Sequence, residues 1–112
     1  MQNLKEKHIY FMGIGGIGMS GIAEILLDWG CHISGSDIKT SNVTERLQRK
    51  GAIIHIGQKA ENITEKIDIV VRSSAIRENN EELIQARKLG IEILHRSQML
   101  AMLMEHKRAI CV

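Results

Sequence analysis

The chain of 112 residues contains no proline and only three aromatic residues, Tyr10, Phe11 and Trp29. Proteins that bind single-stranded nucleic acid by stacking need several aromatic rings among basic residues, so this scarcity argues against that class. The formal net charge of +2 is too small to indicate nucleic acid or a membrane surface by electrostatics alone. We therefore expect no nucleic-acid partner and no membrane partner.

Cysteine and long apolar runs are also scarce. Cys31 and Cys111 lie 80 positions apart and do not make the disulfide framework of a small secreted protein, so both are expected to be buried, inert thiols. No apolar run approaches the roughly 20 residues of a membrane-spanning helix. The polar residues 1–7 lack the hydrophobic segment of a secretion signal, so a cytoplasmic location is expected.

The residues that are present alternate between short apolar runs and helical patterns. Strands are expected at residues 8–12, 31–36, 52–56, 67–71 and 91–94, and helices at residues 17–29, 42–50, 79–89 and 97–106. Strands that alternate with helices indicate a parallel sheet, and nearly continuous apolar strands indicate cover on both faces. The predicted fold is α/β, a Rossmann-like doubly wound sheet of five parallel strands in the order 3-2-1-4-5.

A glycine-rich segment follows the first expected strand and opens the first expected helix. Residues 13–18, Gly-Ile-Gly-Gly-Ile-Gly, fit the pattern G-x-G-x-x-G. In this pattern Gly13 permits a tight turn, Gly15 lets the backbone approach a phosphate, and Gly18 lets the helix pack near the sheet. Backbone N–H groups at the helix start favour a diphosphate. Asp37, nineteen positions after Gly18, is placed to accept hydrogen bonds from ribose hydroxyls.

Other candidate chemistry is weak. The histidines at positions 8, 32, 55, 95 and 106 show no metal-ligand spacing, so no metal site is expected. No serine has a base at motif spacing, and the G-x-S-x-G pattern is absent. Arg96 is either a solvated residue or a cation that reaches a phosphate from the end of the fifth strand. The methionine-rich helix that follows it is expected to lie mostly in the core.

The segment from His8 to Asp37 closely resembles the amino terminus of the UDP-N-acetylmuramate–L-alanine ligases, the MurC branch of the Mur ligase family. The resemblance rests on residues 11–23, Phe-Met-Gly-Ile-Gly-Gly-Ile-Gly-Met-Ser-Gly-Ile-Ala, and on Ser-Gly-Ser-Asp at residues 34–37. It continues through residues 43–47, 73–76 and 96–100, and so spans essentially the whole chain.

This resemblance implies that residues 1–107 form a UDP-binding amino-terminal domain, and that residues 108–112 begin the strand that leads to a central ATP-binding domain. The family's enzymes join L-alanine to UDP-N-acetylmuramate in peptidoglycan biosynthesis, with ATP and Mg²⁺, through an acyl phosphate. The substrate and the central and C-terminal domains are thus the implied partners. No catalytic residue, metal or cofactor is implied within residues 1–112, and ligation by this chain alone is not expected.

The resemblance also assigns site residues. The expected UDP-binding residues are Gly13, Gly15, Gly16, Ile17, Gly18, Ser36, Asp37, Ser73, Ser74 and Ala75. The glycine loop would receive the diphosphate, Ser36 and Asp37 the ribose and uracil, and residues 73–75 would line the same crevice where the strand order reverses. Gln58 departs from the family pattern, which often has histidine there, although an amide also hydrogen-bonds a base edge. The glycine pattern leaves open an NAD- or NADP-binding oxidoreductase domain and a non-catalytic nucleotide sensor.

Overall fold

The computed structural model describes the backbone of residues 7–110 and the side chains of residues 7–105. The strands are β1 (His8–Met12), β2 (His32–Asp37), β3 (Ile53–Ile56), β4 (Ile69–Arg72) and β5 (Glu92–His95). The helices are α1 (Met19–Asp28), α2 (Asn42–Arg49), α3 (Glu81–Lys88) and α4 (Arg96–Ile110), with a 3₁₀ turn, η2, at Ala60–Asn62. Each element lies within about three residues of its expected position, apart from the carboxyl end of α4.

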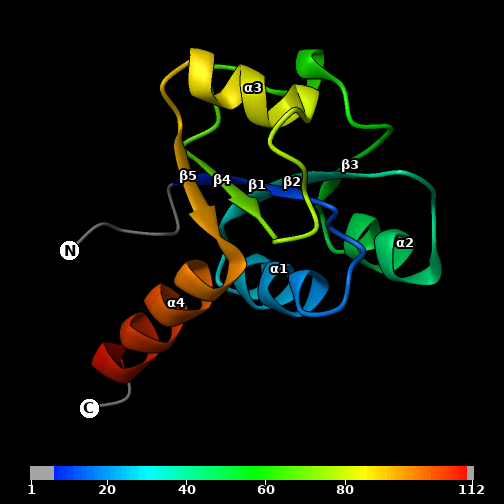
Figure 1. Cartoon of the computed structure of the whole chain (residues 1–112). Coiled ribbons are helices and arrows are strands. Elements are labelled where there is room, and N and C mark those ends of the chain that lie inside the picture. The colour runs from blue at the N-terminus through cyan, green and yellow to red at the C-terminus, as the bar shows by residue number, and fades with distance from the viewer. Residues whose placement is uncertain (1–6, 111–112) are drawn as a thin grey trace.

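All five strands are parallel and follow the order β3-β2-β1-β4-β5, which confirms the predicted fold. Figure 1 shows α1, α2 and α4 on one face of the sheet, and α3 with η2 on the other. The direction of winding changes between β1 and β4, because β1 leads to α1 on one face and β4 leads to α3 on the opposite face.

Two hydrophobic cores lie on the two faces of the sheet. In β1, Ile9 and Phe11 belong to the core under α1 and α4, whereas Tyr10 and Met12 belong to the core under α3. Successive strand residues point to opposite faces, so a strand covered on both sides has no polar alternation. This arrangement explains why the strands were recognisable as continuous apolar runs.

Three helices return to the sheet through short connections that contain a glycine. Gly30, Gly51 and Gly90 follow α1, α2 and α3, each with a positive φ. The backbone N–H of the next residue donates back to a helix carbonyl in all three cases, at about the same distance of 3.0 Å. Each of these connections consists of only three residues.

Helices α2 and α3 begin at Asn42 and Glu81, where the sequence predicts starts at residues 42 and 79. Helix α2 is capped by Ser41, whose hydroxyl accepts from the Thr44 N–H while Thr44 Oγ1 accepts from the Ser41 N–H. Helix α3 is capped by Asn80, whose side chain accepts from the Glu82 N–H at 2.9 Å. Thr44 and Glu82 are buried, so tertiary packing selects between neighbouring cap candidates.

The carboxyl end of the described chain departs further from the sequence prediction. Helix α4 continues through residue 110, so the strand expected to begin at residue 108 is wrong for residues 108–110. No proline or glycine interrupts this segment, and lysine, arginine and alanine at 107–109 favour continued helix. Residues 111–112, with Cys111, and residues 1–6 lie outside the described residues. Within residues 7–110, no helix combines the length and apolar character needed to cross a bilayer.

Histidine 8 makes stability depend on pH. Burial, followed by the nearby His32, lowers the pKa of His8 below its usual value of 6.5, and its Nε2 lies 2.8 Å from Ser34 Oγ. The unfolded chain therefore takes up a proton at higher pH than the folded one, and stability falls as pH drops below about 6.5. We expect the Tm of His8→Gln to fall less than the Tm of the parent when the pH is lowered from 7.5 to 5.5. Equal losses in parallel thermal melts would contradict this.

Candidate nucleotide-binding site

The expected site residues lie together at the carboxyl edge of the sheet. The glycine loop (residues 13–18) follows β1, Asp37 is the last residue of β2, and Ser73 and Ser74 follow β4. Because β1 and β4 are neighbours whose connections leave on opposite faces, these segments border the crevice of a doubly wound sheet (Figure 1).

The glycine loop presents backbone donors at the start of α1. Gly18 is the N-cap residue, with φ +85° and no side-chain cap. The N–H groups of Gly16 and Met19 donate to carbonyls within the loop, at 2.9 and 3.2 Å. Within the described part of the chain, the N–H groups of Ile17 and Gly18 donate to no acceptor. Two free donors at a helix N-terminus make a suitable position for an anion.

The loop is held against the end of β2 by Asp37. The N–H of Gly15 donates to Asp37 Oδ2 at 2.9 Å, and the N–H of Ile38 donates to Oδ1 at 2.8 Å. A Cβ on Gly15 would lie 2.7 Å from Asp37 Oδ2 and 3.0 Å from Thr44 Cγ2. Gly15 is thus needed for contact with a protein carboxylate, whereas the expected reason was approach to a phosphate. Each carboxylate oxygen keeps a lone pair for another donor.

Close packing between loop and sheet depends on Gly35. A Cβ on Gly35 would lie 2.5 Å from the Phe11 carbonyl oxygen and 2.8 Å from the side chain of Ile14. Ile14 is fully buried, and its N–H donates to the Ser36 carbonyl at 2.9 Å. The close approach expected at Gly18 therefore occurs at Gly35. A glycine within a strand pattern indicates such an approach, and this indication was missed.

The side chain of Ser36 faces away from the glycine loop, in contrast to the expectation. It is fully buried, and its hydroxyl donates to Glu82 Oε1 at 2.7 Å on the α3 side of the sheet. Ser36 and Asp37 are consecutive in β2, so their side chains point to opposite faces. Only the backbone of Ser36 contacts the loop.

Glu82 is the centre of a buried polar cluster that the sequence pattern did not reveal. Its carboxylate accepts from Ser36, from the Tyr10 hydroxyl, and from Asn62 Nδ2 at 2.9 Å. Burial, together with the hydrogen bond to Glu82, raises the pKa of Tyr10, which stays a donor. Asn62 Nδ2 also donates to the Gly57 carbonyl at 3.0 Å. The cluster fixes the segments that follow β2 and β3.

The position that departs from the family pattern is connected to the same region. Gln58 Oε1 accepts from Asn80 Nδ2 at 2.8 Å. The Gln58 side-chain oxygen is therefore already hydrogen-bonded to the cap residue of α3. Its amide nitrogen is the group that could hydrogen-bond a nucleotide base.

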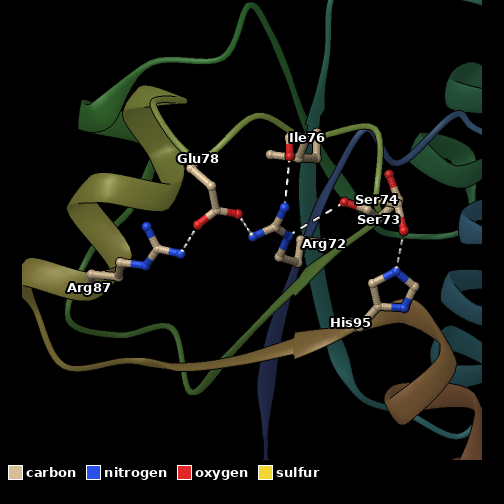
Figure 2. Close-up of polar contacts among 7 residues, drawn as sticks. All are labelled: Arg72, Ser73, Ser74, Ile76, Glu78, Arg87 and His95. Carbon is tan, nitrogen blue, oxygen red and sulfur yellow. Dashed lines mark hydrogen bonds and ion pairs between the residues drawn. The ribbon is translucent and has the colours of Figure 1, made fainter.

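The loop after β4 is braced by charged side chains (Figure 2). The Arg72 guanidinium donates to the Ile76 carbonyl at 2.7 Å and to Glu78 Oε2 at 2.6 Å. Glu78 also pairs with Arg87, and Arg87 with Arg72 lowers the pKa of Glu78. This brace holds residues 73–75, of which Ser73 is half-buried and Ala75 is exposed.

Two further expected residues lie near the loop. Ile17 is fully exposed at its tip. Arg96, the first residue of α4, has its guanidinium beside Gly18, since a Cβ on Gly18 would lie 3.4 Å from Arg96 Nη1. No group of three histidine, cysteine, aspartate or glutamate residues in the described chain is placed to hold a metal ion.

Comparison with known proteins agrees with this geometry. The model of the family described as "Mur ligase family, catalytic domain" matches residues 8–108. The chain belongs to the Mur ligase family. The resemblance inferred from the glycine loop is thereby confirmed.

Named relatives of this Mur ligase chain are UDP-N-acetylmuramate–L-alanine ligases. That of Dichelobacter nodosus is 58% identical over 108 residues, covering 96% of this chain and 22% of the relative. That of Clostridium kluyveri is 51% identical over 110 residues, covering 97% of this chain and 24% of the relative. The chain thus spans about a quarter of these relatives.

A solved structure shows the same architecture. The UDP-N-acetylmuramate–alanine ligase MurC from Thermotoga maritima superimposes with a TM-score of 0.83 at 31% sequence identity. The similarity covers 88% of this chain and 23% of that enzyme. The family therefore uses this Rossmann-like arrangement in a larger protein.

Proposed function

We propose that this Mur ligase domain binds the UDP portion of UDP-N-acetylmuramate, for an ATP-dependent ligase that attaches L-alanine to the muramyl carboxylate. The observation that carries the proposal is the pair of free N–H groups on Ile17 and Gly18, at the start of α1 and beside the carboxyl end of β2. Names of relatives at 51–58% identity support the choice of substrate.

The charges around the loop orient the nucleotide. Asp37 holds the Gly15 side of the loop with a carboxylate, which repels a phosphate and attracts hydroxyl donors. The opposite side has the free donors and the positive end of the α1 dipole. In the proposed complex the ribose would therefore bind at Asp37 and the diphosphate at Ile17–Gly18.

The chemical steps belong to other parts of the enzyme. ATP and Mg²⁺ would supply phosphorylation of the muramyl carboxylate to an acyl phosphate, which the amine of L-alanine attacks with release of phosphate. The role proposed for residues 1–107 is to hold the uridine end of the substrate. The chain alone is expected to show no turnover of ATP with L-alanine.

An NMR titration tests the proposal directly. We expect UDP to shift the amide signals of residues 13–21 saturably, because the ligand replaces water at the loop N–H groups. NAD at the same concentrations is expected to leave these signals unchanged. Saturable NAD binding with no response to UDP would contradict the proposal and favour an oxidoreductase domain.

Gly18→Val is expected to abolish the UDP response. Valine strongly disfavours the φ of +85° at this position, and its side chain would extend from a Cβ only 3.4 Å from the Arg96 guanidinium. Gly21→Ala is the matched control, because its Cβ meets nothing within 4 Å. A folded Gly18→Val protein that binds UDP like the parent would show that the diphosphate lies elsewhere.

A further inference from the structure

Two arginines follow neighbouring strands at the carboxyl edge, and they differ in what they contact. Arg72 is committed to the loop after β4, through Glu78 and two carbonyl oxygens. Arg96, after β5, has no acidic partner and no side-chain hydrogen bond among the described residues. Among the described residues, Arg77 in the loop after β4 also lacks a side-chain partner, but Arg96 is the guanidinium that lies beside Gly18.

The position of Arg96 is set by the fold. Helix α4 begins directly at the end of β5, and α1 and α4 lie on the same face of the sheet (Figure 1). The side chain reaches Gly18, with Nη1 at 3.4 Å and Cζ at 3.9 Å from the position of a Cβ there. Gly18 carries one of the two free N–H groups. The guanidinium thus lies beside the free donors, while the Asp37 carboxylate holds the opposite side of the loop.

Ser74, after β4, adds a hydroxyl group at the same edge of the sheet, where it contacts His95. The backbone N–H of Ser97 donates to His95 Nδ1 at 3.2 Å, and Ser97 Oγ lies 2.9 Å from the same atom, an arrangement that favours the tautomer with its hydrogen on Nε2. Nε2 lies 2.9 Å from Ser74 Oγ and donates to it (Figure 2). The Ser74 hydroxyl hydrogen is then free to point toward an acceptor.

We propose that Arg96 binds the diphosphate across the loop from Asp37, with the Ser74 hydroxyl oriented by His95 as an additional donor. This inference rests on the proposed UDP site and adds the β5–α4 junction to it. A guanidinium forms strong, charge-assisted bonds to phosphate oxygens and matches them in a bidentate manner. Uridine, which has no phosphate, gains nothing from Arg96.

Calorimetric titration of the chain with UDP and with uridine tests this role. Arg96→Gln is expected to weaken UDP binding about tenfold, the loss of one charge-assisted interaction, and to leave uridine binding unchanged. The dependence of UDP affinity on salt should become shallower, because one cation no longer contacts the phosphates. Arg96→Lys keeps the positive charge but not the planar guanidinium, so its UDP affinity should lie between those of the parent and Arg96→Gln.

Arg49→Gln is the matched control, because it removes the same charge from the last residue of α2, where the chain returns to β3. This variant should bind UDP like the parent. A parent chain that binds UDP, with Arg96→Gln and Arg96→Lys equal to it in affinity and salt dependence, would overturn the role of Arg96. A parent chain that binds neither UDP nor uridine would instead refute the proposed function. An equal loss of uridine and UDP binding in Arg96→Gln would show a structural role and also overturn the inference.

Discussion

Gly35→Ala is expected to destabilise the fold by about 3 kcal/mol or more, the scale of severe overpacking in a rigid core. The added methyl group would lie 2.5 Å from the Phe11 carbonyl oxygen, which is backbone and cannot rotate away. It would also lie 2.8 Å from Ile14, which is fully buried and holds the glycine loop on the sheet. Either β1 and β2 separate or the loop lifts, and the UDP response of the loop should weaken as well.

Urea denaturation followed by circular dichroism measures the change. Gly21→Ala is again the control, because it adds the same methyl group inside α1 with open space around it. That variant should gain about 0.5–1 kcal/mol, since alanine is the better helix residue. Equal stability of Gly35→Ala and the parent would show that the sheet and loop can separate at little cost.

Glu82→Ala is expected to cost about 1–3 kcal/mol for each of the two hydroxyl donors that it leaves buried without an acceptor. The Tyr10 and Ser36 hydroxyls would lose their acceptor, and Asn62 would keep only the Gly57 carbonyl. Buried donors without acceptors are costly because water no longer satisfies them. Thermal and urea unfolding of the purified variant measure the loss.

The adjacent residue supplies the comparison. Glu81 lies on the same turn of α3 but is exposed, so Glu81→Ala should change stability by less than about 1 kcal/mol. Glu82→Gln keeps an acceptor oxygen and should lie between the two alanine variants. Similar losses for Glu81→Ala and Glu82→Ala would mean that the interaction of these first-turn carboxylates with the helix dipole, and not the buried cluster, sets the effect.

The sheet order and the glycine loop could be predicted because they depend on local patterns. Continuous apolar runs separated by helical periodicity are sufficient to indicate a doubly wound sheet. The glycine spacing after the first strand indicates a tight turn into α1, and Gly13 has the positive φ that such a turn needs. The orientation of Ser36 was also predictable from strand alternation, although the family resemblance placed it beside Asp37.

The remaining features depend on contacts between distant residues. Glu82 and Tyr10 are separated by 72 positions, and nothing in the local sequence around either indicates their hydrogen bond. The close contact between Gly35 and Ile14 requires knowing where the loop crosses β2. Cap positions are ambiguous in the sequence because the adjacent polar residues Ser41 and Asn42, and Asn79 and Asn80, are similarly good caps.

The three uniform glycine returns from α1, α2 and α3 have a consequence for how this domain can vary. They make the entries to β2, β3 and β5 tight joints of fixed length, whereas β4 is entered through the longer segment of residues 63–68. At the carboxyl edge, six residues separate β1 from α1 and eight residues separate β4 from α3. Insertions and changes of ligand preference can therefore occur in the connections at the carboxyl edge, while the joints into β2, β3 and β5 preserve the geometry of the sheet.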